Sequence, residues 1–141
     1  MRLAASLRYG LYAATALLFG SGASWLAARY FPALHWLPAG LASASMRIHG
    51  AAAMVMLVLT GSAVALHGPG GWRERRNRVS GIALCLALIA ITATGYFLYY
   101  LGDDEARMAA SLSHWTLGLV LPVVLASHAW LGRRDRRADA L

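Results

Sequence analysis

Long apolar stretches alternate with short polar and charged segments along this chain, and four apolar stretches are about twenty residues long. A helix of that length rises about 30 Å, the thickness of the hydrocarbon core of a bilayer. The pattern predicts an all-α integral membrane protein, a four-helix bundle in a single transmembrane domain over residues 1–141. The predicted spans cover residues 9–28, 48–66, 79–101 and 112–131.

The segments around the spans carry signals for helix ends. Residues 68–71 (Gly-Pro-Gly-Gly) follow the second span, and we expect that helix to end there because proline interrupts a helix and glycine tolerates the cap conformation. Asp103, Asp104 and Glu105 precede the fourth span. Negative charge is favourable at a helix N-terminus, so we expect the last helix to begin at these residues.

The composition supports a membrane protein. Hydrophobic residues make up 59% of the chain and charged residues 13%, and the mean hydropathy is +0.53. The net charge of +7 comes from thirteen arginines that flank the apolar stretches. We therefore expect these arginines to contact membrane lipid and to set the topology, and we predict no nucleic-acid partner. The single cysteine, Cys85, excludes a disulfide within one chain.

The distribution of arginine predicts the orientation of the spans. Residues 68–78 and the tail at 132–141 carry four arginines each, whereas residues 29–47 and 102–110 carry three in total. The rule that positive loops stay inside places both termini in the cytoplasm, with the chain running up-down-up-down through a bacterial inner membrane. The first span has features of a signal peptide, but its apolar run is long for one, and we expect it to be retained.

Four histidines lie on the second and fourth spans in two matched pairs. His49 and His67 are eighteen residues apart, which is five helical turns, so they share one face. His114 and His128 are fourteen residues apart, about 40° short of four turns, so they also lie on one stripe. The separations along the helix axes are about 27 Å and about 21 Å, and each pair reaches across most of the membrane.

The two histidine-bearing spans run in the same direction, which places His49 and His114 near the outer surface and His67 and His128 near the inner surface. Two imidazoles that face each other suit haem iron, because each neutral ring donates one lone pair to an axial position. We therefore predict two b haems. The iron of the outer one is ligated by His49 and His114, and that of the inner one by His67 and His128.

The neighbouring residues fit a flat ring between helices. Gly118 lies four residues before Pro122, whose ring presses on the carbonyl of residue 118, and we expect a kink there. Mostly small residues share the His49 face of the second span and leave room near its backbone: Ala52, Ala53, Met56, Thr60 and Ala63.

The histidines also fit roles other than the ligation of two haems. A histidine near the membrane surface can simply hydrogen-bond to a headgroup or a carbonyl, and His67 beside the glycine turn is well placed for that. One haem with two spectator histidines is a further alternative. Zinc is less suitable, because it prefers clustered ligands and the spans contain no carboxylate. His35 lies in a loop flanked by prolines, where we expect a surface residue, with an alternative ligand or a quinol contact as the other option.

Residues 46–134 resemble small bacterial four-helix cytochromes b, relatives of the cytochrome b(561) group and of the haem-bearing membrane subunits of hydrogenases and formate dehydrogenases. The similarity is carried by RIHG and LH in the second span and by SHW and SHAWLGRR in the fourth. It implies two bis-histidine b haems, electron transfer across the inner membrane and exchange with quinone. Several members take a ligand from the first span or have a fifth span, and this chain has neither feature.

The resulting hypothesis is a di-haem electron conduit between the quinone pool and a periplasmic redox protein such as a c-type cytochrome. Arg47 and Arg107 are candidates to pair with haem propionates on the outer side, and Arg78 and Arg133 on the inner side, although each also fits an ordinary arginine at a membrane boundary. Two alternatives are an oxidoreductase that acts on superoxide or another small acceptor at the outer haem, and a membrane anchor without redox function. Homo-oligomer formation is left open.

Overall fold

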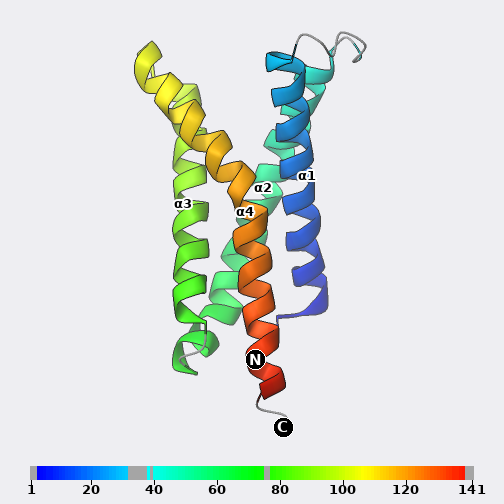
Figure 1. Cartoon of the computed structure of the whole chain (residues 1–141), viewed down its shortest axis with the longest axis vertical. Coiled ribbons are helices and arrows are strands. Elements are labelled where there is room, and N and C mark those ends of the chain that lie inside the picture. The colour runs from blue at the N-terminus through cyan, green and yellow to red at the C-terminus, as the bar shows by residue number, and fades with distance from the viewer. Residues whose placement is uncertain (1–2, 32–37, 39, 75–76, 139–141) are drawn as a thin grey trace. The chain divides into compact units, whose positions relative to one another are not determined.

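The protein is all-α in the part of the chain that the computed structural model describes, which is residues 3–31, 38, 40–74 and 77–138, with backbone only for 135–138. Four helices follow one another along the chain (Figure 1), and each is long and apolar enough to cross a membrane. The all-α fold and the four candidate spans are therefore confirmed, while the orientation of the spans stays a prediction. The helices are α1 (Ala5–Tyr30), α2 (Leu41–Arg73), α3 (Arg78–Tyr100) and α4 (Asp104–Ala138).

The expected end of the second helix at residues 68–71 is wrong. Helix α2 contains Pro69 and continues to Arg73. A proline removes the hydrogen bond that its own N–H would donate, and its ring presses on the carbonyl four residues earlier. So close to a polar helix end that carbonyl can tilt outward and accept from water. Among the described glycines only Gly40 has a positive φ, of 84°, so the glycines beside Pro69 do not form a left-handed cap.

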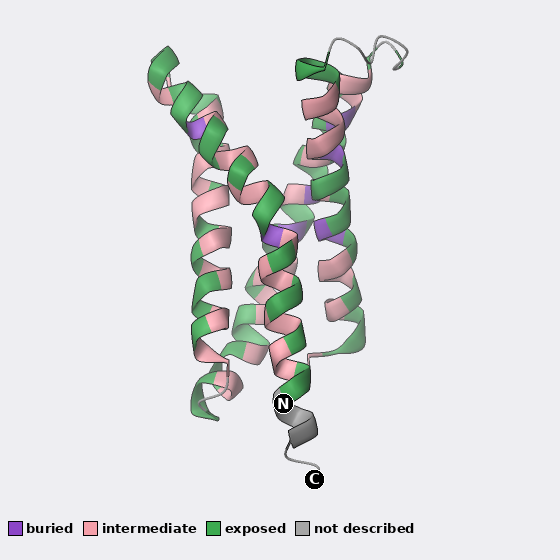
Figure 2. Ribbon diagram, viewed as in Figure 1, coloured by how far each residue is buried: buried purple, intermediate pink, exposed green. Residues whose placement is uncertain are grey.

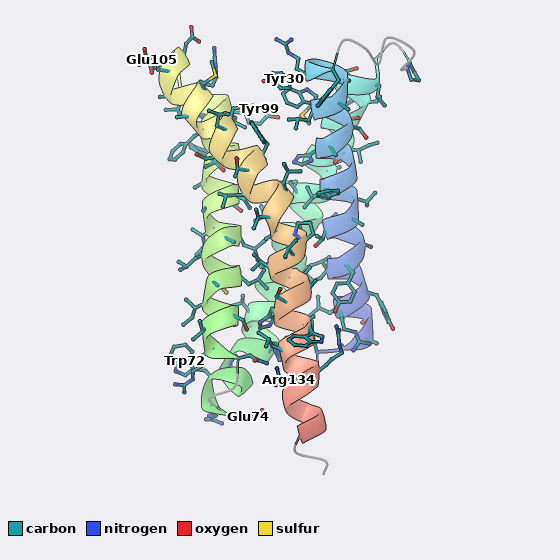
Figure 3. The ribbon with its side chains drawn as sticks, in the orientation of Figure 1. Tyr30, Trp72, Glu74, Tyr99, Glu105 and Arg134 are labelled. Carbon is teal, nitrogen blue, oxygen red and sulfur yellow. The ribbon has the colours of Figure 1, made fainter. Side chains whose placement is uncertain are left out.

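A residue in the left-handed conformation precedes α3. Asn77 adopts the left-handed conformation with a φ of 50°, which asparagine tolerates better than most residues, immediately before α3 begins. Arg78 then folds back over Trp72: its Nε donates to the Trp72 carbonyl at 3.1 Å and its guanidinium lies 4.6 Å from the centre of the indole ring. Figure 3 labels Trp72, which lies near the end of α2. The Arg78 side chain, a candidate for a propionate contact, thus has a local structural role.

The last helix begins where the acidic residues predict. The Oδ2 atom of Asp103 accepts a hydrogen bond from the Ala106 N–H at 2.8 Å, and α4 starts at Asp104. This cap satisfies one of the amide donors that the first turn of a helix leaves without a partner. Helix α4 runs through Pro122, and Figure 1 shows that it changes direction part-way along its length, as the expected kink requires.

The chain divides into two compact units, residues 1–70 and residues 71–141, each built around a pair of helices. In the first unit α1 packs against α2, and a Cβ added at Gly10 would lie 3.3 Å from the Leu59 side chain. In the second unit α3 packs against α4, and a Cβ at Gly118 would lie 3.6 Å from Ile91. The assembly of the two pairs into one bundle stays a prediction.

The buried residues of each helix pair are few and mostly small (Figure 2). Many large apolar side chains point outward, as with Val79, which is 84% exposed. Small residues at contacts between helices and large apolar residues outside them are typical of membrane helices, because lipid is as apolar as the protein interior. The buried residues are Ala14, Thr15, Ser21, Ser45, Ala52, Met56, Ala110 and Leu121.

Candidate functional site

His49 is held by a serine of the neighbouring helix. Its Nδ1 atom lies 3.0 Å from the Ser21 hydroxyl on α1. That hydroxyl approaches the Leu17 carbonyl of its own helix at 2.6 Å, and a carbonyl only accepts, so the single hydroxyl proton is donated there. The serine oxygen is therefore left to accept from the Nδ1–H of His49, which also forms a hydrogen bond with the backbone of Leu18.

His114 has the same arrangement in the second unit. Its Nδ1 lies 3.2 Å from the Thr94 hydroxyl of α3 and 3.1 Å from the Ile91 carbonyl. Because the carbonyl can only accept, the Nδ1 atom must carry the proton. The Thr94 hydroxyl donates its own proton along α3, where the Ala90 carbonyl is 2.9 Å away.

His128 follows the same pattern near the other end of the α3–α4 pair. Its Nδ1 lies 3.0 Å from the hydroxyl of Ser80 on α3, and that hydroxyl lies 3.1 Å from the Asn77 carbonyl. With the serine proton donated to Asn77, the Nδ1–H of His128 is the donor between the two side chains.

A glycine follows the hydroxyl residue in all three cases, and it lets the imidazole lie against the backbone of the neighbouring helix. An added Cβ would lie 3.3 Å from Cε1 of His49 at Gly22, 3.1 Å from Cε1 of His114 at Gly95, and 3.6 Å from Cε1 of His128 at Gly81. We call each hydroxyl-glycine dipeptide a hydroxyl–glycine clamp. The three clamps are Ser21-Gly22, Ser80-Gly81 and Thr94-Gly95.

The clamps fix the tautomer of the three histidines. With the proton on Nδ1, the Nε2 atom of a neutral imidazole keeps its lone pair. Histidine ligands of metals characteristically donate their other ring N–H to an acceptor, which fixes the tautomer and strengthens the ligand. The arrangement therefore gives His49, His114 and His128 the form that an axial ligand of haem iron needs.

His67 differs from the other three. Its Nδ1 atom is buried and has no hydrogen-bond partner in the described part of the chain, and the same is true of Oγ1 of Thr60. Both residues lie on the stripe of α2 that also carries His49, because seven residues make about two helical turns. The second helix thus presents two buried polar atoms that have no hydrogen-bond partner among the described residues.

Thr60→Val tests whether the buried hydroxyl of Thr60 lacks a hydrogen-bond partner. A buried hydroxyl without a hydrogen bond costs about 1–3 kcal/mol, and valine has nearly the same shape. We expect Thr60→Val to unfold at a higher temperature than the wild type, measured by circular dichroism in detergent. The control is Thr92→Val on α3, which removes an exposed hydroxyl that does bond, to the Leu88 carbonyl at 2.7 Å, and should not be stabilising. A less stable Thr60→Val protein would contradict the prediction.

The arginines expected near haem propionates lie on the exposed surface. Arg47 and Arg133 are exposed, and the half-exposed side chain of Arg107 forms an ion pair with Asp104. Pairing of Arg47 or Arg107 with a propionate stays a prediction. His35 lies outside the described residues.

The aromatic residues at the end of α3 are mostly exposed. Tyr96 stacks on Tyr100 with ring centres 4.3 Å apart, and Tyr99 is 86% exposed (Figure 3). Exposed tyrosines at the end of a membrane helix are typical of the aromatic belt at the lipid–water interface.

The spacing of two clamps was a signal that sequence reasoning missed. Ser80 and Thr94 are fourteen residues apart on α3, the same spacing as His114 and His128 on α4. In an antiparallel pair this match brings each hydroxyl opposite one histidine. His67 lies eighteen residues after His49, so the matching position on the antiparallel first helix would lie eighteen residues before Ser21. That position is Leu3, which precedes α1 and has no hydroxyl, and it cannot form a clamp with His67.

Comparison with known proteins gives no match to any family model, curated protein or solved structure. Within the described residues, no three side chains of histidine, cysteine, aspartate or glutamate come together as a protein-only metal site would require.

Proposed function

We propose that this protein is a membrane cytochrome b that binds two b haems through histidines of α2 and α4. His49 and His114 hold one iron, and His67 and His128 hold the other. The observation that carries the proposal is the repeated clamp, because three of the four histidines have Nδ1–H bonded to a hydroxyl and therefore carry the lone pair on Nε2. If the histidines only linked neighbouring helices by hydrogen bonds, either ring nitrogen could serve, and the same nitrogen would not be needed in all three.

The residues present fit such a cofactor. The donors are neutral imidazoles, and the stripe of α2 between His49 and His67 includes Ala52 and Ala63, which have small side chains. An iron atom with two imidazole ligands has no open position for substrate and exchanges one electron at a time. The part played by the chain is to orient the imidazoles, to exclude water and to insulate the route with apolar helices.

The setting that we propose is a bacterial inner membrane with both termini in the cytoplasm. Two haems at different depths would connect quinone or quinol in the membrane with a redox protein in the periplasm. On this topology Asp103, Asp104 and Glu105 lie on the periplasmic side, where their exposed side chains would face a redox partner such as a c-type cytochrome. The acidic residues and the predicted topology support this part of the proposal.

The haem content of the purified protein tests the proposal directly. We expect two b haems per chain by the pyridine haemochrome assay, with reduced-minus-oxidised spectra typical of bis-histidine iron. The protein should be expressed in a host that supplies haem and purified in mild detergent. A folded, helical protein without colour would contradict the proposal and favour the membrane anchor.

A further inference from the structure

We propose that one end of the second unit is a binding site for an anionic phospholipid, a diacyl lipid with a net negative charge such as phosphatidylglycerol. The site consists of arginines and tryptophans around the start of α3 and the end of α4, and we call it the basic end. All of these residues belong to the unit 71–141, so the site requires neither haem nor the first unit. The side chains of the basic end are Trp72, Arg73, Arg78, Trp130, Arg133 and Arg134.

The start of α3 and the end of α4 lie side by side within this unit. Nδ1 of His128 lies 3.0 Å from the hydroxyl of Ser80, which is in the first turn of α3. Trp130 and Arg134 follow His128 by two and six residues, so they belong to the part of α4 that lies beside and just beyond the start of α3. Figure 3 labels Trp72 and Arg134 at this end.

Two arginines of the basic end lie over tryptophan rings. The guanidinium of Arg78 is 4.6 Å from the ring centre of Trp72, and that of Arg134 is 5.7 Å from the ring centre of Trp130. A guanidinium held beside a ring keeps N–H groups that can donate to phosphate oxygens. Both indoles are more than half exposed, and Val79 beside Arg78 is 84% exposed. Cations next to exposed apolar side chains match a lipid, whose phosphate lies directly above its acyl chains.

The protein itself does not neutralise the charge of the basic end. Residues 72–78 and 132–141 carry eight arginines and three acidic residues. Arg73, Arg133 and Arg134 are exposed and form no ion pair with the acidic side chains that the structure describes, and the first turn of α3 contains no acidic residue. At the opposite end of the same helix pair Arg107 pairs with Asp104. The basic end therefore favours an anionic headgroup over a zwitterionic one.

Native mass spectrometry of the full-length protein tests this site. Phosphatidylglycerol and phosphatidylcholine with the same acyl chains are added in equal amounts to the protein in mild detergent, and we expect phosphatidylglycerol to be retained preferentially. Arg134→Gln should reduce this preference about fivefold, the effect of removing one arginine from an anionic membrane surface. The exposed position of Arg134 makes this variant compatible with folding. Arg134→Lys keeps the positive charge and should keep most of the preference.

Arg29→Gln is the matched control, because Arg29 also lies over an aromatic ring at a helix end, 5.8 Å from the ring centre of Tyr30 on α1. Arg29 is outside the basic end, so this variant should keep the wild-type lipid preference. Equal retention of the two lipids by the wild type, or an equal loss of preference in Arg134→Gln and Arg29→Gln, would overturn the inference. Retention of added inorganic phosphate in place of the lipid would assign the arginines to a soluble anion and overturn it as well. None of these outcomes depends on the haem content of the samples.

Discussion

His114→Ala should leave the purified protein with one haem per chain in place of two. The alanine methyl group cannot donate a lone pair to iron, and the Thr94 hydroxyl that held the imidazole is left without its donor. His128 stands fourteen residues further along α4, about 21 Å away, with its own clamp on Ser80, so the second site should keep its cofactor. The pyridine haemochrome assay measures the change as a loss of half the haem.

His35→Ala is the matched control for this experiment. It removes the one histidine that the hypothesis leaves out of the ligand set, so two haems per chain should remain. His49→Ala should reproduce the effect of His114→Ala, because the two are proposed to share one iron. Retention of both haems in His114→Ala, with its helical content unchanged, would contradict the assignment of the ligands.

The helices and the histidine stripes could be predicted from the sequence because both depend on periodicity. Apolar runs long enough to cross a bilayer identify the spans without any knowledge of packing. The faces of His49 and His67 follow from 3.6 residues per turn. The end of α2 could not be placed in this way, because Pro69 lies so near the end of the helix that the lost hydrogen bond is readily compensated.

The clamps could not be predicted from single residues, because hydroxyls in membrane helices usually bond to their own backbone. Ser24, Ser62 and Thr92 do this with the carbonyl four residues earlier and hold no histidine. Ser21 and Thr94 make the same bond and in addition accept from an imidazole. A hydroxyl contacts an imidazole only where the neighbouring helix has a histidine opposite it. In the sequence, this pairing is visible only as the matching fourteen-residue spacings on α3 and α4.

Gly95→Ala should weaken haem binding at the His49–His114 site about tenfold, which is the lower end of the effect of disturbing an outer-shell partner of a metal ligand. The added methyl group would lie 3.1 Å from Cε1 of His114, closer than carbon atoms normally approach, so the ring must move by a few tenths of an ångström. The bond from Nδ1 to Thr94 is already 3.2 Å long, and such a shift strains it further.

Gly81→Ala provides the control, because the same change in the other clamp of α3 meets more space. Its methyl group would lie 3.6 Å from Cε1 of His128, an ordinary van der Waals contact, so the ring can stay in place. Transfer of haem to apomyoglobin measures both variants: Gly95→Ala should release one of its two haems faster than the wild type, and Gly81→Ala should release both at the wild-type rate. If the glycines position the imidazoles, the two variants must differ, because their methyl groups would lie 3.1 Å and 3.6 Å from the histidine rings. Equal rates of haem release from the two variants would instead mean that both glycines serve the packing of α3 on α4.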